Sequence, residues 1–171
     1  HIPNWEPHLE GLAWRPVQVL EIGCFEGRAT KWMAETLLSH PDAHITVCDT
    51  FAGSMEHRDG TIQVDTSAIE RVFDAEVMSA FPGKVTKRKG LSIETLLSLH
   101  LEAPPKAFDL IYVDGSHVAR DVMADALLAW PLLKPGGVLI FDDYSWRLYA
   151  DAALTPKAAI DAFLARFSSE L

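Results

Sequence analysis

The sequence predicts an α/β fold, a doubly wound, Rossmann-like parallel sheet in three α/β/α layers. Short runs rich in β-branched and aromatic residues alternate along the chain with longer stretches of helical periodicity, which is the pattern of βαβ units. Right-handed crossovers then give a parallel sheet with helices on both faces. Glycines and carboxylates stand directly after several of the runs, where open α/β sheets bind ligands.

The strands are expected in five apolar runs. These runs are too short for helices and are enriched in the residue types that favour strands. They cover residues 17–22, 44–49, 84–87, 108–113 and 137–141.

Helices are indicated between and after these runs. A capping box formed by Ser67 and Glu70 predicts a helix in which apolar residues keep helical spacing as far as Ala80. A second helix is expected over about residues 118–133, ending at a Pro and Gly-rich turn. A third opens at Thr155 with a proline in its first turn and extends to about residue 167.

Length and composition indicate one globular domain over residues 1–171. The net charge of −9, from 15 Lys+Arg and 24 Asp+Glu, argues against nucleic acid as a partner, since that binding depends on neutralising phosphates. No stretch approaches the roughly 18 apolar residues of a membrane span, and no signal-peptide pattern is visible. Cys24 and Cys48 cannot form a disulfide framework and lack metal-ligand spacing. We therefore expect a soluble, cytoplasmic protein.

A glycine-containing turn follows the first run. Glu21, Gly23, Cys24, Phe25 and Gly27 lead from this strand into a helix, and glycines at such a turn let the backbone approach a ligand closely. The turn differs from the Gly-x-Gly-x-x-Gly of dinucleotide binders, because Phe25 stands where another glycine is expected. The alternative is that the glycines serve only helix–strand packing.

A carboxylate ends the second run. Asp49 lies 22 residues beyond Gly27, at the place where a carboxylate can accept both hydroxyls of a ribose. The alternative is an aspartate that stabilises a loop turn.

Three carboxylates and a histidine follow the fourth and fifth runs. Asp114, Asp142 and Asp143 should converge, and at about 4 Å each pair would repel by several kcal/mol. A cation between them would relieve this repulsion, and oxygen ligands suit Mg²⁺ or a related divalent ion. His117, with an ordinary pKa near 6.5, could accept a substrate proton beside this ion. The alternative is that the aspartates cap helices or turns.

These motifs together resemble the class I S-adenosylmethionine-dependent methyltransferases over nearly the whole chain, from about residue 17 to residue 167. The residues that carry the resemblance are Glu21, Gly23, Gly27, Asp49, Asp114 and the turn Lys134–Gly137. Asp114-x-x-His117 with Asp142 and Asp143 is in addition similar to the metal-dependent, macrocin-type sugar O-methyltransferases. The likeness to catechol O-methyltransferases is more distant.

The resemblance implies strand order 3-2-1-4-5, with the basic segment 84–89 at the sheet edge. It implies transfer of a methyl group to a hydroxyl of a small molecule, a sugar or a phenol, with His117 as the base and Mg²⁺ on Asp114, Asp142 and Asp143. Phe51 would lie against the adenine of the cofactor, with Ser92 nearby. The cofactor-binding residues it implies are Glu21, Gly23, Cys24, Phe25, Gly27, Asp49, Thr50, Phe51, Ser92 and Asp114.

One departure from the family and several alternatives follow. Such folds normally finish with a hairpin of strands 6 and 7, which is missing after residue 167, so we expect either a truncated chain or a five-stranded sheet. An open edge beside strand five would favour a homo-oligomer. The alternatives to metal-assisted methyl transfer are a metal-independent small-molecule methyltransferase, an NAD-type oxidoreductase and a non-catalytic cofactor-binding module.

Overall fold

The sheet has the predicted strands and the predicted order. The structure is a computed structural model that describes residues 2–103 and 107–169. Its strands are all parallel and lie in the order β3-β2-β1-β4-β5, so the predicted order 3-2-1-4-5 is confirmed. The strands are β1 (Gln18–Ile22), β2 (His44–Asp49), β3 (Val85–Lys89), β4 (Phe108–Val113) and β5 (Leu133–Phe141).

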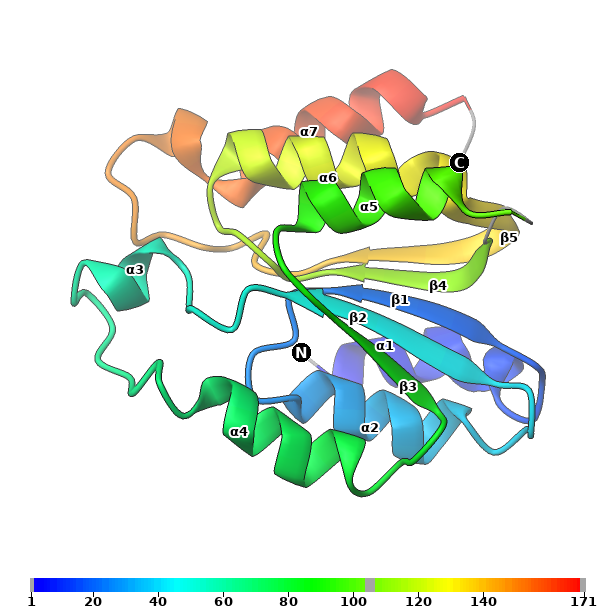
Figure 1. Ribbon diagram of the computed structural model, residues 1–171. Coiled ribbons are helices and arrows are strands. Elements are labelled where there is room, and N and C mark those ends of the chain that lie inside the picture. Colours follow the sequence, from blue (N-terminus) through cyan, green and yellow to red (C-terminus); the bar gives the residue numbers. More distant parts are fainter. Residues whose placement is uncertain (1, 104–106, 170–171) are drawn as a thin grey trace.

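Helices cover both faces of this sheet, which confirms the three-layer architecture (Figure 1). One layer contains α1 (Ile2–Leu9), α2 (Arg28–Leu37) and α4 (Ile69–Phe73). The other contains α5 (Ser92–Leu101), α6 (Ala119–Ala129) and α7 (Pro156–Phe167). The short helical segments are η1 (Glu10–Leu12), α3 (Met55–Arg58), η2 (Asp74–Met78), η3 (Trp130–Leu132) and η4 (Ala152–Leu154).

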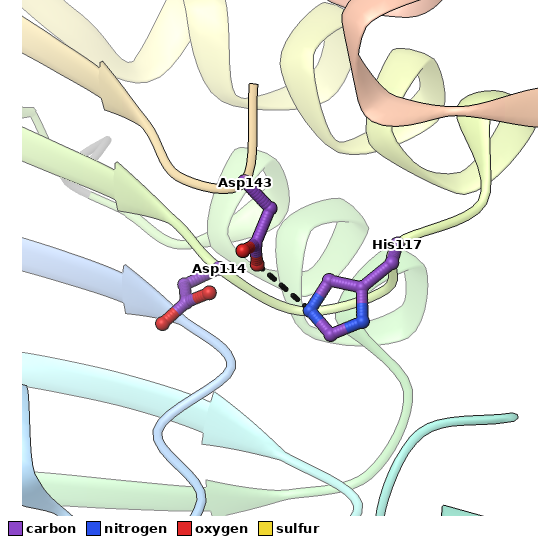
Figure 2. Close-up of side chains that lie close together, drawn as sticks. All are labelled: Asp114, His117 and Asp143. Carbon is purple, nitrogen blue, oxygen red and sulfur yellow. Dashed lines mark ion pairs between the residues drawn. The ribbon is translucent and has the colours of Figure 1, made fainter. Parts of the chain in front are cut away.

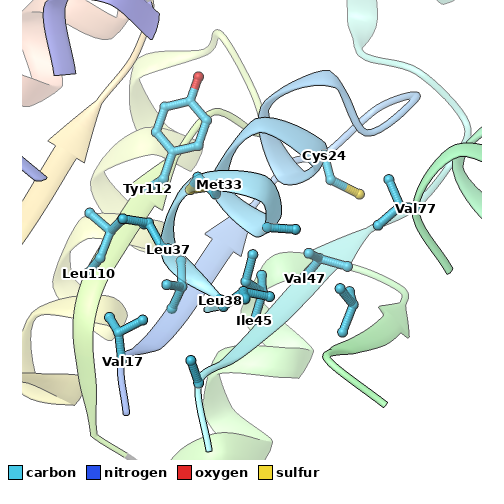
Figure 3. Close-up of a cluster of buried hydrophobic side chains, with 14 of the residues drawn as sticks. Val17, Cys24, Met33, Leu37, Leu38, Ile45, Val47, Val77, Leu110 and Tyr112 are labelled. Carbon is cyan, nitrogen blue, oxygen red and sulfur yellow. The ribbon is translucent and has the colours of Figure 1, made fainter. Parts of the chain in front are cut away.

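Two apolar clusters hold the layers together. Figure 3 shows the first, in which Ile45, Val47 and Leu110 of the sheet meet Met33 and Leu37 of α2. The second lies on the opposite face, between the sheet and the α5–α6 layer. The central strands are therefore buried on both sides, which explains why they read as nearly continuous apolar runs.

The helix expected over residues 67–80 differs in two respects. It begins at Ile69 and changes after Phe73 into the π-helical segment Asp74–Met78. The predicted capping box is wrong, because the Ser67 hydroxyl donates to Asp65 Oδ1 at 2.6 Å. The helices expected near residues 118–133 and 155–167 are confirmed as α6 with η3 and as α7.

The basic edge strand β3 is neutralised by neighbouring acids. Lys87 Nζ lies 3.0 Å from Glu70 Oε1 and 2.6 Å from Asp74 Oδ1, and Lys89 also pairs with Glu70. Glu70 thus forms ion pairs with lysines of the edge strand β3 and does not cap a helix.

Strand β5 begins earlier than expected. Leu133 already pairs with Phe108, and a register irregularity between Phe108 and Leu110 accommodates the turn residues that follow Leu133. The turn Lys134–Gly137 therefore lies inside the strand and not before it.

Along the described chain, we find no helix with the length and apolar character that a bilayer crossing needs.

Candidate active site

A cavity of about 930 Å³ opens at the carboxyl ends of the strands. Its lining comes from the loops that follow all five strands, and α3 lies in the loop beyond β2, outside the strand ends (Figure 1). The volume falls within the 300–1,000 Å³ typical of small-molecule sites. Among the residues predicted for the site, those that line it are Glu21, Gly23, Cys24, Phe25, Asp49, Thr50, Ser92, Asp114, His117, Asp142 and Asp143.

Gly27 and Phe51 do not line this cavity. A Cβ atom at Gly27 would lie 2.4 Å from the Val77 side chain and 2.8 Å from that of Phe73, so helix packing requires the glycine. The Phe51 side chain is buried in the core, with its ring centroid 5.4 Å from that of Phe73. The Phe51 side chain thus packs in the core and does not line the cavity, and a contact of Phe51 with an adenine ring stays a prediction.

The turn after β1 is held by Asp49. Its Oδ2 accepts the backbone N–H groups of Cys24 and Phe25 at 2.7 and 2.8 Å. Phe25 has φ +48°, a left-handed conformation that costs a non-glycine residue about 1–2 kcal/mol. Asp49 thus has the loop-stabilising role given above as the alternative. An ionised carboxylate has about four acceptor sites, so this role leaves room for a ligand hydroxyl.

Glu21 supplies a buried acceptor at the cavity floor. It is fully buried, and the Thr30 hydroxyl donates to its Oε2 at 2.6 Å. Its Oε1 has no partner among the described residues. Burial raises the pKa of this carboxyl well above its usual range, with the charges of Asp114 and Asp49 adding to the shift. A buried polar atom without a partner is rare and fits an incoming donor such as the ammonium group of S-adenosylmethionine.

Asp114, His117 and Asp143 form a compact cluster beyond the carboxyl ends of the strands (Figure 2). One possible ligand atom from each lies within 4.8 Å of the others. Asp114 follows β4, His117 precedes α6, and Asp143 follows β5 in a left-handed conformation with φ +55°. The adjacency of β4 and β5 therefore brings these distant segments together.

The imidazole of His117 is held on two edges and one face. Its Nε2 lies 2.8 Å from Asp143 Oδ2, and its Nδ1 lies 2.6 Å from Glu56 Oε1. The Trp146 ring stacks on it at 3.8 Å between centroids. Burial lowers the pKa of His117, but the bonds to Asp143 and Glu56 outweigh it and leave a net upward shift.

Asp142 lies beside this cluster with a different set of contacts. The Tyr112 hydroxyl contacts Asp114 Oδ2 at 2.8 Å and also contacts Asp142 Oδ2, so one phenol proton serves two acids. Asp142 Oδ1 also accepts the backbone N–H of Asp143 at 2.7 Å. The structure thus brings Asp114, His117 and Asp143 together as candidate metal ligands, and a metal contact from these residues or from Asp142 stays a prediction.

The chemistry of these donors fits a divalent cation. Burial raises the pKa of Asp114 to about 8, the Tyr112 hydrogen bond opposes the shift, and the charges of Asp142 and Asp143 add to it. Such crowding favours either a bound proton or a cation. Carboxylate oxygens are the ligands that Mg²⁺ prefers.

Three contributors were missed by the sequence reasoning. Glu56 reaches His117 across 61 residues of chain. Tyr112 belongs to a buried strand, and Trp5 of α1 packs on its ring at 4.4 Å between centroids while lining the cavity. No local pattern marks any of the three, since each acts through a contact that only the tertiary fold creates.

The fold, the turn after β1 and the carboxylate after β2 define the class I S-adenosylmethionine-dependent methyltransferases. The chain belongs to a family described as a methyltransferase domain, whose model matches residues 20–144. These findings give no support to the NAD-type alternative. No curated protein sequence matches the chain.

Solved structures share this fold at low sequence identity. CalS11, a calicheamicin methyltransferase, is 17% identical with a TM-score of 0.61, over 96% of this chain and 68% of CalS11. MycE of the mycinamycin pathway, in complex with Mg and SAH, is 17% identical with a TM-score of 0.65, over 98% of this chain and 40% of MycE. The O-methyltransferase NovP is 21% identical with a TM-score of 0.64, over 90% of this chain and 65% of NovP. The chain thus spans less than two thirds of MycE and of NovP.

Proposed function

We propose that this chain transfers the methyl group of S-adenosylmethionine to a hydroxyl of a small molecule, assisted by a divalent cation, with His117 as the general base. The observation that carries the proposal is the position of the His117 imidazole. One ring nitrogen faces the carboxylates of Asp114 and Asp143, which with Asp142 form the acidic cluster. The cluster lies in the cavity that the turn after β1 also lines.

The cofactor would occupy the half of the cavity nearest β1 and β2. Gly23 allows close approach of the backbone, Glu21 Oε1 offers an acceptor to the ammonium group, and Asp49 offers oxygens to the ribose. Ser92, at the start of α5, lines the same cavity near the expected adenine position. The supporting observation is the buried Glu21 Oε1, which has no partner among the described residues although Glu21 lines the cavity.

The cation would be held by Asp114 and Asp143, with Asp142 beside them. When bound, Mg²⁺ supplies Lewis acidity that lowers the pKa of a coordinated hydroxyl and orients it. Without it, the clustered carboxylates must share protons, as the shared Tyr112 hydroxyl and the raised pKa of Asp114 indicate.

The protein's own part in the reaction is alignment and proton removal. His117 Nε2 faces the cluster and would accept the proton of the acceptor hydroxyl, while the oxygen forms a bond to the methyl carbon and the carbon–sulfur bond breaks. S-adenosylhomocysteine then leaves as the product. Holding donor and acceptor in line can contribute about 7–11 kcal/mol to the lowering of the barrier.

The acceptor class is a sugar or a phenol. CalS11 is a TDP-rhamnose 3'-O-methyltransferase, and MycE has been solved with mycinamycin VI. In this chain, Trp146 lines the cavity beside His117 and offers an aromatic surface to such a ring.

The test is methyl transfer from labelled S-adenosylmethionine to two probe acceptors, TDP-rhamnose and catechol, in Mg²⁺ and in excess EDTA. We expect product in Mg²⁺, loss of it in EDTA, and recovery on adding Mg²⁺ back. Equal turnover in EDTA would favour the metal-independent alternative. Tight binding of S-adenosylhomocysteine without transfer to either acceptor would favour the non-catalytic alternative.

A further inference from the structure

We infer that Glu56 is a positioning residue, which holds the His117 imidazole so that its Nε2 faces the acidic cluster. The inference rests on the proposed function, because it names how the general base of that function is oriented. Glu56 itself does not touch the acidic cluster; it acts through the far nitrogen of the ring, with Oε1 2.6 Å from Nδ1.

Glu56 is an unusual residue for its surroundings. It lies in the one-turn helix α3, within an otherwise exposed and irregular loop, yet its side chain is only 2% exposed. A glutamate is rarely buried to this degree unless it is paired. The partner here is His117, which comes from the far side of the cavity mouth, between β4 and α6.

The carboxylate is fixed from several directions. The Ser54 hydroxyl donates to Oε1, and the Tyr149 hydroxyl lies 3.5 Å from Oε2. The backbone around it is held as well, since the Ile62 N–H donates to the Glu56 carbonyl at 2.8 Å. An acceptor anchored in this way can define the orientation of the ring that it contacts.

Orientation matters because imidazole has two distinct nitrogens. When the ring is neutral, a carboxylate that accepts the Nδ1 proton leaves the lone pair on Nε2. In the structure Nε2 lies 2.8 Å from Asp143 Oδ2, so this nitrogen can act as a base only in the form in which it does not donate to Asp143. Loss of this partner would let the ring adopt the other tautomer or rotate about χ2. In serine hydrolases, loss of the equivalent carboxylate lowers turnover by about 10⁴-fold at unchanged geometry. Trp146 still fixes the ring plane here, so we expect a smaller effect.

A purely structural role for Glu56 is the competing explanation, because the same contact ties the loop of α3 to the start of α6. Asp59 provides a matched control for loop integrity. It lies in the same loop, its Oδ1 accepts the Thr61 N–H at 2.9 Å, and it does not line the cavity. A change at Asp59 therefore perturbs the loop without touching His117.

The kinetic test compares Glu56→Ala, Glu56→Gln and Asp59→Ala for methyl transfer to TDP-rhamnose or catechol. We expect Glu56→Ala to lower kcat about 10–100-fold, with KM for S-adenosylmethionine within about twofold, Glu56→Gln to retain more activity, and Asp59→Ala to match the wild type. In the His117→Ala background, Glu56→Ala should cause no further loss, since the two residues act as one unit. Additive losses, or an unchanged kcat in Glu56→Ala, would overturn the inference.

A second readout does not depend on turnover. In proton NMR of the protein with ¹⁵N-labelled histidine, the Nδ1 proton of His117 should give a low-field, slowly exchanging resonance. This resonance should disappear in His117→Ala and Glu56→Ala and persist in Asp59→Ala. Its persistence in Glu56→Ala would overturn the inference. If the wild type methylates neither acceptor, the proposed function fails, and the resonance alone decides whether Glu56 holds the ring.

Discussion

Gly23 and Asp114 approach each other so closely that no side chain fits between them. A Cβ atom at Gly23 would lie 2.1 Å from the backbone carbonyl oxygen of Asp114, and Gly23 has φ +81°. The Asp114 N–H in turn donates to the Ile22 carbonyl at 2.7 Å. The turn after β1 and Asp114, the first carboxylate of the acidic cluster, are therefore held in direct backbone contact across β1 and β4.

This contact predicts a large effect for Gly23→Ala. The clash is with backbone and not with a flexible side chain, so we expect a loss of several kcal/mol in the free energy of unfolding. Gly60→Ala is the matched control, because Gly60 also has φ +81° but no described atom lies within 4 Å of the position that a Cβ atom would take there. Gly60→Ala should lower the free energy of unfolding only by the cost of a left-handed backbone at alanine, about 1–2 kcal/mol. Equal losses by chemical denaturation would contradict the tight contact.

His117→Ala should separate binding from turnover. The imidazole faces the acidic cluster and not the turn after β1, so we expect unchanged affinity for S-adenosylmethionine by calorimetry. Turnover should fall about 10²–10⁴-fold, the usual contribution of a general base. Wild-type turnover in this variant would show that the histidine is structural.

Phe51→Leu tests whether this phenylalanine serves the core or the cofactor. Its ring packs against Phe73 in the core, and its side chain is 6% exposed. We expect the free energy of unfolding to fall by about 1–3 kcal/mol, because the smaller side chain leaves a space. The affinity for S-adenosylmethionine should change by less than about twofold. A tenfold weaker affinity for S-adenosylmethionine at unchanged stability would instead support a contact between Phe51 and the adenine.

Asp125 predicts how stability depends on pH. Burial raises its pKa to about 6, the nearby Ser92 hydroxyl opposes the shift, and the charge of Asp121 adds to it. Between the unfolded pKa near 3.9 and the folded pKa, the folded state binds more protons than the unfolded state, so stability falls as pH rises through this window. At about 1.4 kcal/mol per pKa unit, ionisation of Asp125 costs about 2–3 kcal/mol above pH 6.

Asp125→Asn should remove this dependence. Denaturant unfolding between pH 4 and pH 7 should show a smaller decline for the variant than for the wild type. An identical decline in both proteins would show that Asp125 ionises in the folded state as easily as in the unfolded state.

The sheet was predictable because its signal is local. Buried parallel strands such as β2 and β4 are nearly continuous apolar runs, and their bounds agree with the sequence pattern residue for residue. The residues after the strands were predictable for a related reason, since parallel strands bring their carboxyl ends to one edge. This is why Asp114, His117 and Asp143 meet.

Side-chain direction and long-range partners were not predictable. Phe51 follows Asp49 closely, but the sequence does not show that a left-handed residue, with φ +55°, turns its ring into the core. Ser67 and Glu70 match a capping box, but each has a stronger partner elsewhere, Asp65 and the lysines of β3. The contact of Glu56 with His117 leaves no periodic or local trace in the sequence.

The most direct test of the account is calorimetric titration of Mg²⁺ into the protein saturated with S-adenosylmethionine. The wild type and Asp42→Asn, which changes an exposed carboxylate just before β2, at the amino ends of the strands, should both bind one ion with a saturable heat. Asp143→Asn should lose that binding at least tenfold, because it removes one of the converging carboxylates. Equal binding in all three proteins, or none in the wild type, would contradict the account.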